Sequence, residues 1–368
     1  MALPVLLLGV ISLIVSLLAS WTMIRIAPRL GLIDKPGGRK IHSQPKPLGG
    51  GVAIFTALAL PMLLGLIALR FFKFAPDSDL VAALIRGARQ QSSLALTLIA
   101  TTAAMHILGL IDDRRALGPW LKLLAQLLAA AALVVPFREV RILTALGAAP
   151  SIALTVLWIA AITNAFNFLD NMDGLSAGVA AVCSTAFLVT AISIQQWFVA
   201  ATLALLLGAL LGFLFFNFPP AKIFMGDSGS LVIGFVLGVL TVRTTYLAPG
   251  EDFARGWYAV FAPVIVLALP LYDLIVVSII RLSRGKSPFV GDTNHFSHRL
   301  VARGMSRRTA VLCLYLVTAA TSIAAILLPH VHTTMAALLI FGQTILVLGL
   351  VALLEQHPLP LADDKVTR

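Results

Sequence analysis

The sequence has few charged residues: Asp, Glu, Lys and Arg make up 12% of its 368 residues, whereas 59% are hydrophobic. A soluble globular protein of ordinary composition carries about 25% charged residues. This deficit excludes a soluble domain, and the mean hydropathy of +0.98 indicates a polytopic membrane protein. Cysteine is also scarce, with two in the whole chain, which excludes a disulfide framework.

The sequence also lacks internal repeats, low-complexity tracts and any polar stretch suited to a separate soluble domain. We therefore interpret residues 1–368 as a single integral membrane domain. The net charge of +11 would suit nucleic acid, but the basic residues lie in loops between apolar runs. That placement indicates membrane topology and anionic ligands, with membrane lipid as a partner and no nucleic acid.

Apolar runs of the length needed to cross a bilayer, about 20 residues, dominate what is present. They predict an all-α fold, a polytopic integral membrane protein with about 10–11 transmembrane helices. The runs are Leu3–Ile24, Leu48–Leu69, Leu94–Ile111, Trp120–Phe137, Ser151–Phe168, Leu175–Ile194, Trp197–Phe216, Leu231–Tyr246, Trp257–Ile280, Ala310–Leu328 and Thr333–Leu354. Small residues four apart, as at Gly208 and Gly212, permit close helix packing. We favour packing within one subunit over a homodimer contact.

Lysine and arginine are distributed unevenly among the loops between these runs. The loops at 25–47 and 281–308 hold most of the basic charge, and they fall on the same side if every run spans the membrane. The positive-inside rule makes that side cytoplasmic. We therefore expect a multi-pass protein of the inner (plasma) membrane with its N-terminus outside. The polar motifs described next all fall on the cytoplasmic side, which predicts an active site at the cytoplasmic face.

The stretch from 164 to 174, NAFNFLDNMDG, closes the fifth apolar run. It carries Asn164, Asn167, Asp170 and Asp173 at every third position. Side chains three residues apart on a helix lie on one slanting stripe, so a continuing helix would turn all four toward one place. Acids at the edge of a membrane span are costly and are functional candidates by default.

Two more acidic motifs lie at the ends of apolar runs. Asp112 and Asp113 close the third run and are followed by two arginines; the alternative interpretation is a charge cluster that only stops the helix. Asp227 lies in Gly-Asp-Ser-Gly just before the eighth run, where a helix start would suit phosphate. The alternative there is an aspartate that caps its own helix.

Together these carboxylates supply hard oxygen ligands without a matching set of thiolates or imidazoles. Such a set favours Mg²⁺, with Mn²⁺ as the alternative, over Zn²⁺. In the most basic loop, His295, His298 and Arg299 could share a helical face and grip a diphosphate, or could belong to a solvated surface loop. Asp273, inside the ninth run, could be paired internally or make a functional contact, and His106 is assigned a packing role.

Several motifs occur in order: Leu110-Ile-Asp-Asp113, Asn164 to Gly174, Gly212 to Asn217, Phe224 to Asp227 and Asn294 to Leu300. From about Gly31 to Arg303, the chain resembles the polyprenyl-phosphate N-acetylhexosamine-1-phosphate transferases. The resemblance implies Mg²⁺-dependent transfer of a HexNAc-1-phosphate, GlcNAc-1-phosphate above all, from a UDP-HexNAc to undecaprenyl or another polyprenyl phosphate. UMP would be released, and the product would start a lipid-linked cell-envelope glycan.

The resemblance also implies roles for single residues. Asp227 would be the principal Mg²⁺ ligand, with Asp170 in the same centre, and Asp112 and Asp113 would lie at the reacting phosphates. The residues assigned to substrate binding are Asn167, Asp173, Asn217, Phe224, His295, His298 and Arg299. Within this set, Asp173 and Asn217 look like nucleoside-binding positions, Phe224 matches an aromatic residue that stacks on uracil, and the last three resemble a loop that holds the sugar-diphosphate end.

Other functions fit parts of this pattern. The phospho-N-acetylmuramoyl-pentapeptide transferase branch usually has a run of adjacent histidines, whereas this sequence resembles the GlcNAc-type branch, with Ser297 where many of its members have another histidine. A multi-span transporter should show inverted repeats or interrupted helices near mid-membrane, but these acids cluster at one interface. For the reaction, we favour direct displacement, with Asp112 positioning or deprotonating the acceptor, over a covalent aspartyl-phosphate.

Overall fold

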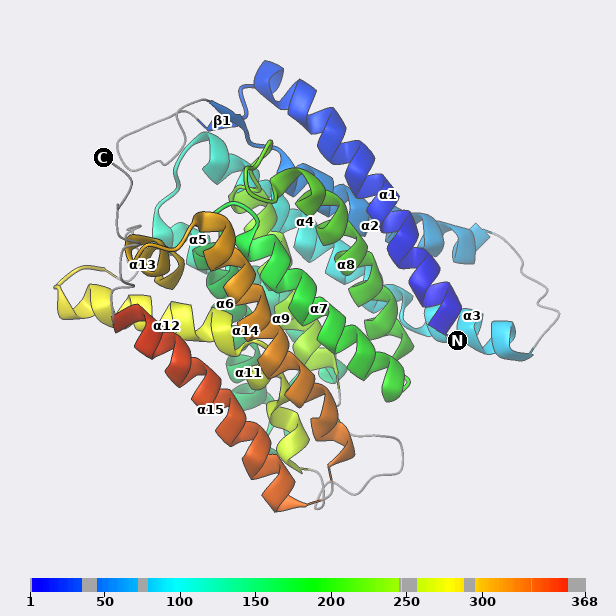
Figure 1. Ribbon diagram of the computed structural model, residues 1–368. Helices are drawn as coiled ribbons and strands as arrows, with labels where there is room; N and C mark the ends of the chain where they lie inside the picture. Colours follow the sequence, from blue (N-terminus) through cyan, green and yellow to red (C-terminus); the bar gives the residue numbers. More distant parts are fainter. Residues whose placement is uncertain are drawn as a thin grey trace, which may run out of the picture.

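The computed structural model describes residues 2–34, 45–71, 79–244, 246, 257–287, 295–331 and 333–356. These residues form a bundle of long helices (Figure 1). The described part also contains a two-stranded antiparallel sheet, in which β1 (Ile33–Asp34) pairs with β2 (Lys46–Pro47). The prediction of an all-α polytopic architecture is confirmed.

Each predicted apolar run contains a helix. The helices are α1 (Ala2–Ile26), α2 (Gly50–Phe71), α4 (Ser92–Arg114), α5 (Pro119–Val134), α6 (Ala148–Leu169), α7 (Leu175–Ser193), α8 (Trp197–Asn217), α9 (Asp227–Arg243), the pair α11 (Ala262–Val266) and α12 (Ala268–Ser283), α14 (Arg307–Leu327) and α15 (Thr334–Gln356). In the described residues, 8 helices are long and apolar enough to cross a membrane, or up to 9 when the bent pair counts as one span. The helices α5 and α9 are shorter, with 16 and 17 residues.

The ninth run, predicted as one span, is broken. Its two parts, Trp257–Val266 and Ala268–Ser283, meet at an angle of 66°. The reason lies in Pro270, which has no N–H to donate to the carbonyl of Val266 four residues earlier. That carbonyl lies 3.5 Å from the Sγ of Cys183 on α7, which donates to it in place of the missing amide. The span therefore bends without leaving this acceptor unsatisfied.

Short elements lie between the long helices. They are η1 (Ala27–Leu30), α3 (Asp79–Gln90), η2 (Arg138–Val140), η3 (Thr144–Leu146), η4 (Trp257–Phe261), α13 (Phe296–Ala302) and η5 (Leu328–His330). The helix α3 was not predicted, because its 12 residues mix apolar and charged types and are too few to span a bilayer. The helix α13 carries the end of the histidine motif.

The centre of the bundle is formed by α7, α8 and α9. Every residue of α9 from Ser228 to Val242 is buried. Small residues let neighbouring helices approach this centre closely: a Cβ added at Gly208 would lie 2.1 Å from the carbonyl oxygen of Gly9 on α1. At Gly234, an added Cβ would lie 2.6 Å from the Cα of Thr163 on α6. The interpretation of these glycines as packing positions within one subunit is confirmed.

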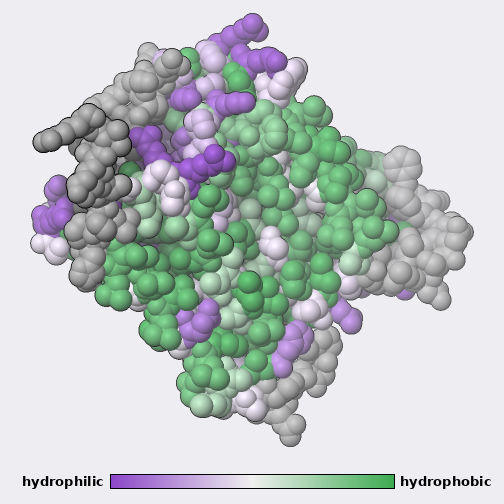
Figure 2. All heavy atoms as spheres, viewed as in Figure 1, coloured by the Kyte–Doolittle hydropathy of each residue, from purple (hydrophilic) through white to green (hydrophobic). Residues whose placement is uncertain are grey.

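The outer surface separates polar from apolar side chains along the bundle. Exposed leucine, isoleucine and valine side chains cover the flanks of α1, α2, α14 and α15. Figure 2 shows this flank as a broad hydrophobic area, with hydrophilic residues gathered at the end where β1 and α13 lie. The N-terminus of α1 lies at the opposite end (Figure 1). This pattern fits a bundle whose flank faces lipid.

Candidate active site

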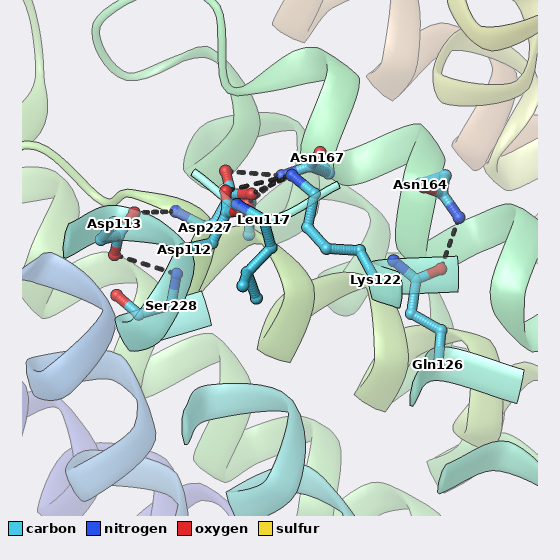
Figure 3. Close-up of polar contacts among 10 residues, drawn as sticks. Asp112, Asp113, Leu117, Lys122, Gln126, Asn164, Asn167, Asp227 and Ser228 are labelled. Atoms are coloured by element: carbon cyan, nitrogen blue, oxygen red, sulfur yellow. Dashed lines mark hydrogen bonds and ion pairs between the residues drawn. The ribbon is translucent and has the colours of Figure 1, made fainter. Parts of the chain in front are cut away.

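Three helix ends bring the central polar residues together (Figure 3). Asp112 and Asp113 lie in the last turn of α4, Asn167 lies in the last turn of α6, and Asp227 is the first residue of α9. The Nδ2 of Asn167 donates to Oδ1 of Asp227 at 3.0 Å and to Oγ of Ser230 at 2.9 Å. Motifs separated by two or more apolar helices in the sequence therefore meet within hydrogen-bonding distance.

Asp113 caps the start of α9 from the neighbouring helix α4. Its Oδ1 accepts the N–H of Asp227 at 2.7 Å, and its Oδ2 accepts the N–H of Ser228 at 3.2 Å. The residue before them, Gly226, has φ 71°, and a Cβ there would lie 2.5 Å from Asp113 Oδ2. These N–H groups would otherwise lack partners at a helix start. Because Asp113 caps them, the side chain of Asp227 does not cap its own helix and is left to face the site.

The segment that leads into α9 is also held from the other side, by the start of α2. The N–H of Gly50 donates to the carbonyl of Phe224 at 3.0 Å, and the N–H of Gly51 donates to the carbonyl of Met225 at 3.0 Å. A Cβ on Gly51 would lie 2.3 Å from Oγ of Ser228, so only glycine permits this approach. Asp227 is thus presented from a backbone segment that is fixed by α2 and α4 together.

Lys122 joins two of the carboxylates (Figure 3). Its Nζ donates to Oδ2 of Asp112 at 3.0 Å and to Oδ2 of Asp227 at 2.9 Å. The remaining oxygen of Asp112 accepts the N–H of Leu117 at 2.6 Å. The sequence interpretation counted Lys122 only as a charge that sets topology. The signal was its position as the single charged residue of α5, in the first turn after the acidic end of α4.

Asp170 follows directly after α6 and is partly buried. In the described part of the chain, its carboxylate accepts no hydrogen bond from a side chain. Burial, followed by the negative charges of Asp227, Asp113 and Asp173, raises the pKa of Asp170 well above its ordinary value. A carboxylate in this setting lacks a positive partner.

The donor set fits a divalent cation held jointly with a substrate. No group of three or more His, Cys, Asp or Glu side chains within the described ranges is arranged to hold a metal ion by itself. Mg²⁺ usually takes one or two carboxylates together with phosphate oxygens and water, so a cage of protein ligands is not required. Asp227 and Asp170 supply hard oxygens, and among the described residues Lys122 is the one ammonium paired with the cluster. This excess of negative charge favours an added cation.

The residues assigned to the nucleoside shape the loops beside this cluster. The N–H of Gly174 donates to Oδ1 of Asn217 at 2.9 Å, and Nδ2 of Asn217 donates to the carbonyl of Ile223 at 2.8 Å. Oδ2 of Asp173 accepts the N–H of Ala221 at 2.9 Å. Phe224 is partly buried, and its main chain pairs with that of Pro47 and the start of α2. Their nucleoside-binding roles stay predictions.

The histidine segment is anchored in the interior. Nδ1 of His295 lies 2.7 Å from Oδ2 of Asp273, whose Oδ1 accepts the N–H of Phe296 at 3.1 Å. Nη2 of Arg281 lies 3.4 Å from Nε2 of His295. The structure thus shows Asp273 in the internal pairing that was one of its two interpretations. His298 is partly buried, and residues 292–294 of the motif lie outside the described residues.

The same segment contacts the residues on either side of Asp170. Oγ of Ser297 donates to Oδ1 of Asn171 at 2.6 Å, and Asn171 is the residue after Asp170. The ring of Phe168, at the end of α6, meets the ring of His295 edge to face with centroids 5.7 Å apart. Substrate-binding roles for His295, His298 and Arg299 stay predictions, but α13 lies next to the turn that carries Asp170.

The chain is similar to known proteins over most of its length. Residues 95–245 match the glycosyl transferase family 4 model, and this range holds all four carboxylates of the cluster. A probable undecaprenyl-phosphate N-acetylglucosaminyl 1-phosphate transferase of Bacillus subtilis (strain 168) is 33% identical over 344 residues, which cover 90% of this chain and 87% of that protein. The chain belongs to glycosyl transferase family 4.

Two further relatives of this family 4 member have names that describe similar transferases. A decaprenyl-phosphate N-acetylglucosaminephosphotransferase of Mycobacterium tuberculosis (strain ATCC 25618 / H37Rv) is 34% identical over 84% of this chain and 79% of that protein. An undecaprenyl-phosphate alpha-N-acetylglucosaminyl 1-phosphate transferase of Escherichia coli (strain K12) is 26% identical over the same shares of the two chains. The resemblance to the polyprenyl-phosphate N-acetylhexosamine-1-phosphate transferases is confirmed.

One expectation about this family 4 member was wrong, namely that of a single polar stripe from Asn164 to Asp173. The helix α6 ends at Leu169, so Asp170 and Asp173 lie beyond it. Nδ2 of Asn164 donates to Oε1 of Gln126 on α5 at 2.6 Å instead of facing the carboxylates. Gly174, at φ 75°, turns the chain sharply into α7. The four side chains therefore have separate partners, although Asn167 and Asp170 both lie in the cluster.

Proposed function

We propose that this family 4 member transfers GlcNAc-1-phosphate from UDP-GlcNAc to undecaprenyl phosphate or another polyprenyl phosphate and releases UMP. The observation that carries this proposal is the cluster of Asp112, Asp170 and Asp227 with Lys122 at one end of an apolar bundle. A phosphorylated lipid in the membrane and a nucleotide-sugar from water can both reach such a place. The named activities of the relatives support the same reaction. The product would begin a lipid-linked cell-envelope glycan.

The reaction needs charge cancellation more than it needs a base. An oxygen of the acceptor phosphate forms a bond to the β-phosphorus of the donor, and the bond to the oxygen that bridges the two phosphates breaks, so that UMP leaves with that electron pair. A phosphate monoester has a second pKa of about 6, so the acceptor is already largely dianionic at neutral pH. Lys122, held between Asp112 and Asp227, offers a fixed positive charge to the two anions.

Each carboxylate then has a distinct task in this proposal. Asp227 and Asp170 would hold Mg²⁺, which when bound neutralises the diphosphate and stabilises the leaving phosphate. Asp112, fixed by Lys122 and by the N–H of Leu117, would position the acceptor. Asp113 would act by holding the first turn of α9, and so Asp227, in place. Direct displacement fits this arrangement because no additional base is required.

The site faces the cytoplasm in this proposal, with the N-terminus of α1 outside the inner membrane. The support is the positive-inside rule applied to the basic loop at 281–308, together with the position of α13 at the same end of the bundle as β1 (Figure 1). A transporter is disfavoured because the carboxylates gather at the ends of α4, α6 and α9 instead of at the break between α11 and α12.

A donor panel tests the reaction. Purified protein, Mg²⁺ and undecaprenyl phosphate are incubated with UDP-GlcNAc, UDP-GalNAc or UDP-MurNAc-pentapeptide, and released UMP is measured. We expect UMP from UDP-GlcNAc. Its release from the pentapeptide donor alone would favour the other branch, and its absence with every donor would reject the enzyme. A labelled phosphosugar trapped on the protein without acceptor would exclude direct displacement.

A matched pair of variants tests the metal assignment. Asp227→Asn should abolish UMP release while the protein still elutes as a folded, monodisperse species in detergent. Glu139→Gln makes the same carboxylate-to-amide change at an exposed position on η2 and should leave turnover unchanged. Preserved activity in Asp227→Asn would remove its proposed role.

A further inference from the structure

The last helix contains one ionisable residue, Glu355, which lies at the end of α15. The helix is mostly exposed on the flank of the bundle, and its buried residues Ala337, Thr344, Val351 and Glu355 form one narrow face. Glu355 is only 6% exposed. Because a buried acid at the end of an apolar helix is costly unless it is paired, its contacts indicate its purpose.

Glu355 pairs with Arg299 of the histidine segment. Its Oε2 lies 2.9 Å from Nη2 of Arg299 and accepts a hydrogen bond from the hydroxyl of Tyr272, on α12, at 3.4 Å. Nε and Nη2 of Arg299 are buried and donate no hydrogen bond in the described residues, so the contact of Nη2 with Glu355 is an ion pair. A guanidinium has donors on several edges. One part of this group is thus held by Glu355, while the Nε donor remains unused.

Arg299 is carried on a segment that is fixed against the carboxylate cluster. The start of α13 is anchored through His295 and Phe296 to Asp273. One residue further along, Ser297 bonds to Asn171, the neighbour of Asp170. Arg299 lies two residues beyond this contact. An arginine with an unused donor, on a helix whose first turn contacts the neighbour of Asp170, suits the diphosphate of a nucleotide-sugar.

We propose that Glu355 is a positioning residue, which holds the guanidinium of Arg299 so that its unused donor meets the diphosphate of the donor substrate. The inference rests on the proposed function for the identity of that substrate. A long arginine side chain without a partner must lose its rotamer freedom on binding, whereas one held by a carboxylate has lost that freedom already. The rotamer entropy that one such side chain loses corresponds to a weakening of UDP-sugar binding of about threefold to tenfold.

Four variants test the proposal: Glu355→Gln, Arg299→Met, the two combined, and Glu139→Gln as the matched control. For each, the KM values for UDP-GlcNAc and for undecaprenyl phosphate, kcat, the inhibition constants of UDP and UMP, and the melting temperature in detergent are measured. We expect Glu355→Gln to raise the KM for UDP-GlcNAc and the inhibition constant of UDP by about threefold to tenfold. The KM for the lipid, kcat and the inhibition constant of UMP, which lacks the second phosphate, should change by less than about twofold on the same scale.

The combined variant separates positioning from a second, independent contact. If Glu355 acts through Arg299, then Arg299→Met alone and the combined variant should weaken UDP binding equally. An unchanged inhibition constant of UDP in Glu355→Gln, or additive effects in the combined variant, would overturn the proposal. If Glu355→Gln melts at a much lower temperature, Glu355→Asp replaces it as the test, because aspartate keeps the charge on a side chain shorter by one methylene. The proposal then requires that Glu355→Asp weaken UDP binding.

Direct binding of UDP, measured by calorimetry on the full chain, distinguishes failure of this inference from failure of the proposed function. If the unaltered protein released no UMP with any donor, the proposed function would fail. If the unaltered protein were active and the Glu355→Gln variant bound UDP as tightly as the unaltered protein does, only the positioning role would fail.

Discussion

Gly109 offers a sharp test of how α4 holds the catalytic end of α9. His106, Gly109 and Asp113 are three and four residues apart, so they lie on one face of α4. Nδ1 of His106 lies 2.9 Å from the carbonyl oxygen of Ser228 and, because a carbonyl can only accept, Nδ1 carries the hydrogen. Asp113 accepts the N–H groups of Asp227 and Ser228. Gly109 lies between these contacts, so that α4 meets the first turn of α9 without an intervening side chain.

Gly109→Ala would force the two backbones apart. The added Cβ would lie 2.3 Å from both N and Cα of Ser228, whereas ordinary contacts begin near 3.4 Å. The clash is with backbone, so no rotamer change relieves it, and α9 must move by about 1 Å relative to α4. Overpacking of this kind costs about 1–3 kcal/mol of stability. A misplacement of about 1 Å in a catalytic group can lower the rate by about 100-fold.

The control is Gly65→Ala, the same substitution at an exposed glycine of α2, where an added Cβ meets nothing within 4 Å. Alanine is the better helix former by about 1 kcal/mol, so this variant should be as stable as the unaltered protein or more stable. Melting temperature in detergent and UMP release are measured for both variants. A Gly109→Ala protein that melts and turns over like Gly65→Ala would refute this account of the α4–α9 contact.

Three further predictions concern charge in the site. Lys122→Met should lower kcat by about 100-fold or more, because the charge offered to the two anions is lost. UMP release, measured at saturating Mg²⁺ beside the unaltered protein, checks this, and activity within about twofold of the unaltered protein would contradict it. Asp170→Asn should raise the melting temperature of EDTA-treated protein at pH 8. The pKa of Asp170 is raised in the folded state, which penalises its charged form, so the unaltered protein gains stability as the pH falls through that pKa. The difference in melting temperature between the variant and the unaltered protein should therefore shrink in acid. Removal of divalent ions should stop UMP release, and added Mg²⁺ should raise the melting temperature of the unaltered protein but not of Asp227→Asn; an equal rise in both would place the ion elsewhere.

The spans could be predicted from the sequence because bilayer thickness fixes the length of an apolar helix. The same reasoning placed Asp112, Asp113, Asn167 and Asp227 on one side, since they lie at the ends of helices that alternate in direction. It did not predict the bend in the ninth run, because a proline in an apolar run is not a sufficient signal: Pro61 lies inside the continuous helix α2, whereas at Pro270 the freed carbonyl is taken over by Cys183. Such a partner, remote in sequence, leaves no local pattern.

The contacts of single side chains were less predictable for the same reason. In the sequence, Lys122 counts as one more charge near a membrane surface, where basic residues set topology, and Glu355 is not singled out. Lys122 pairs with Asp227, 105 residues away, as well as with the nearer Asp112, and Glu355 pairs with Arg299 on a different helix. Only the packing of the helices reveals these pairs.

The Gly-Asp-Ser-Gly motif shows why a local pattern can leave a role open. An aspartate at a helix start is common as a cap of its own helix, and the sequence offers nothing to separate that role from metal binding. In the structure, Asp113 caps the helix from α4, so the carboxylate of Asp227 is released to pair with Lys122 and Asn167. Asp112 shares the same lysine, and Asp170 has no positive partner in the described chain. The cap supplied by α4 thus leaves negative charge concentrated between α4, α6 and α9, where a divalent cation and a diphosphate would balance one another.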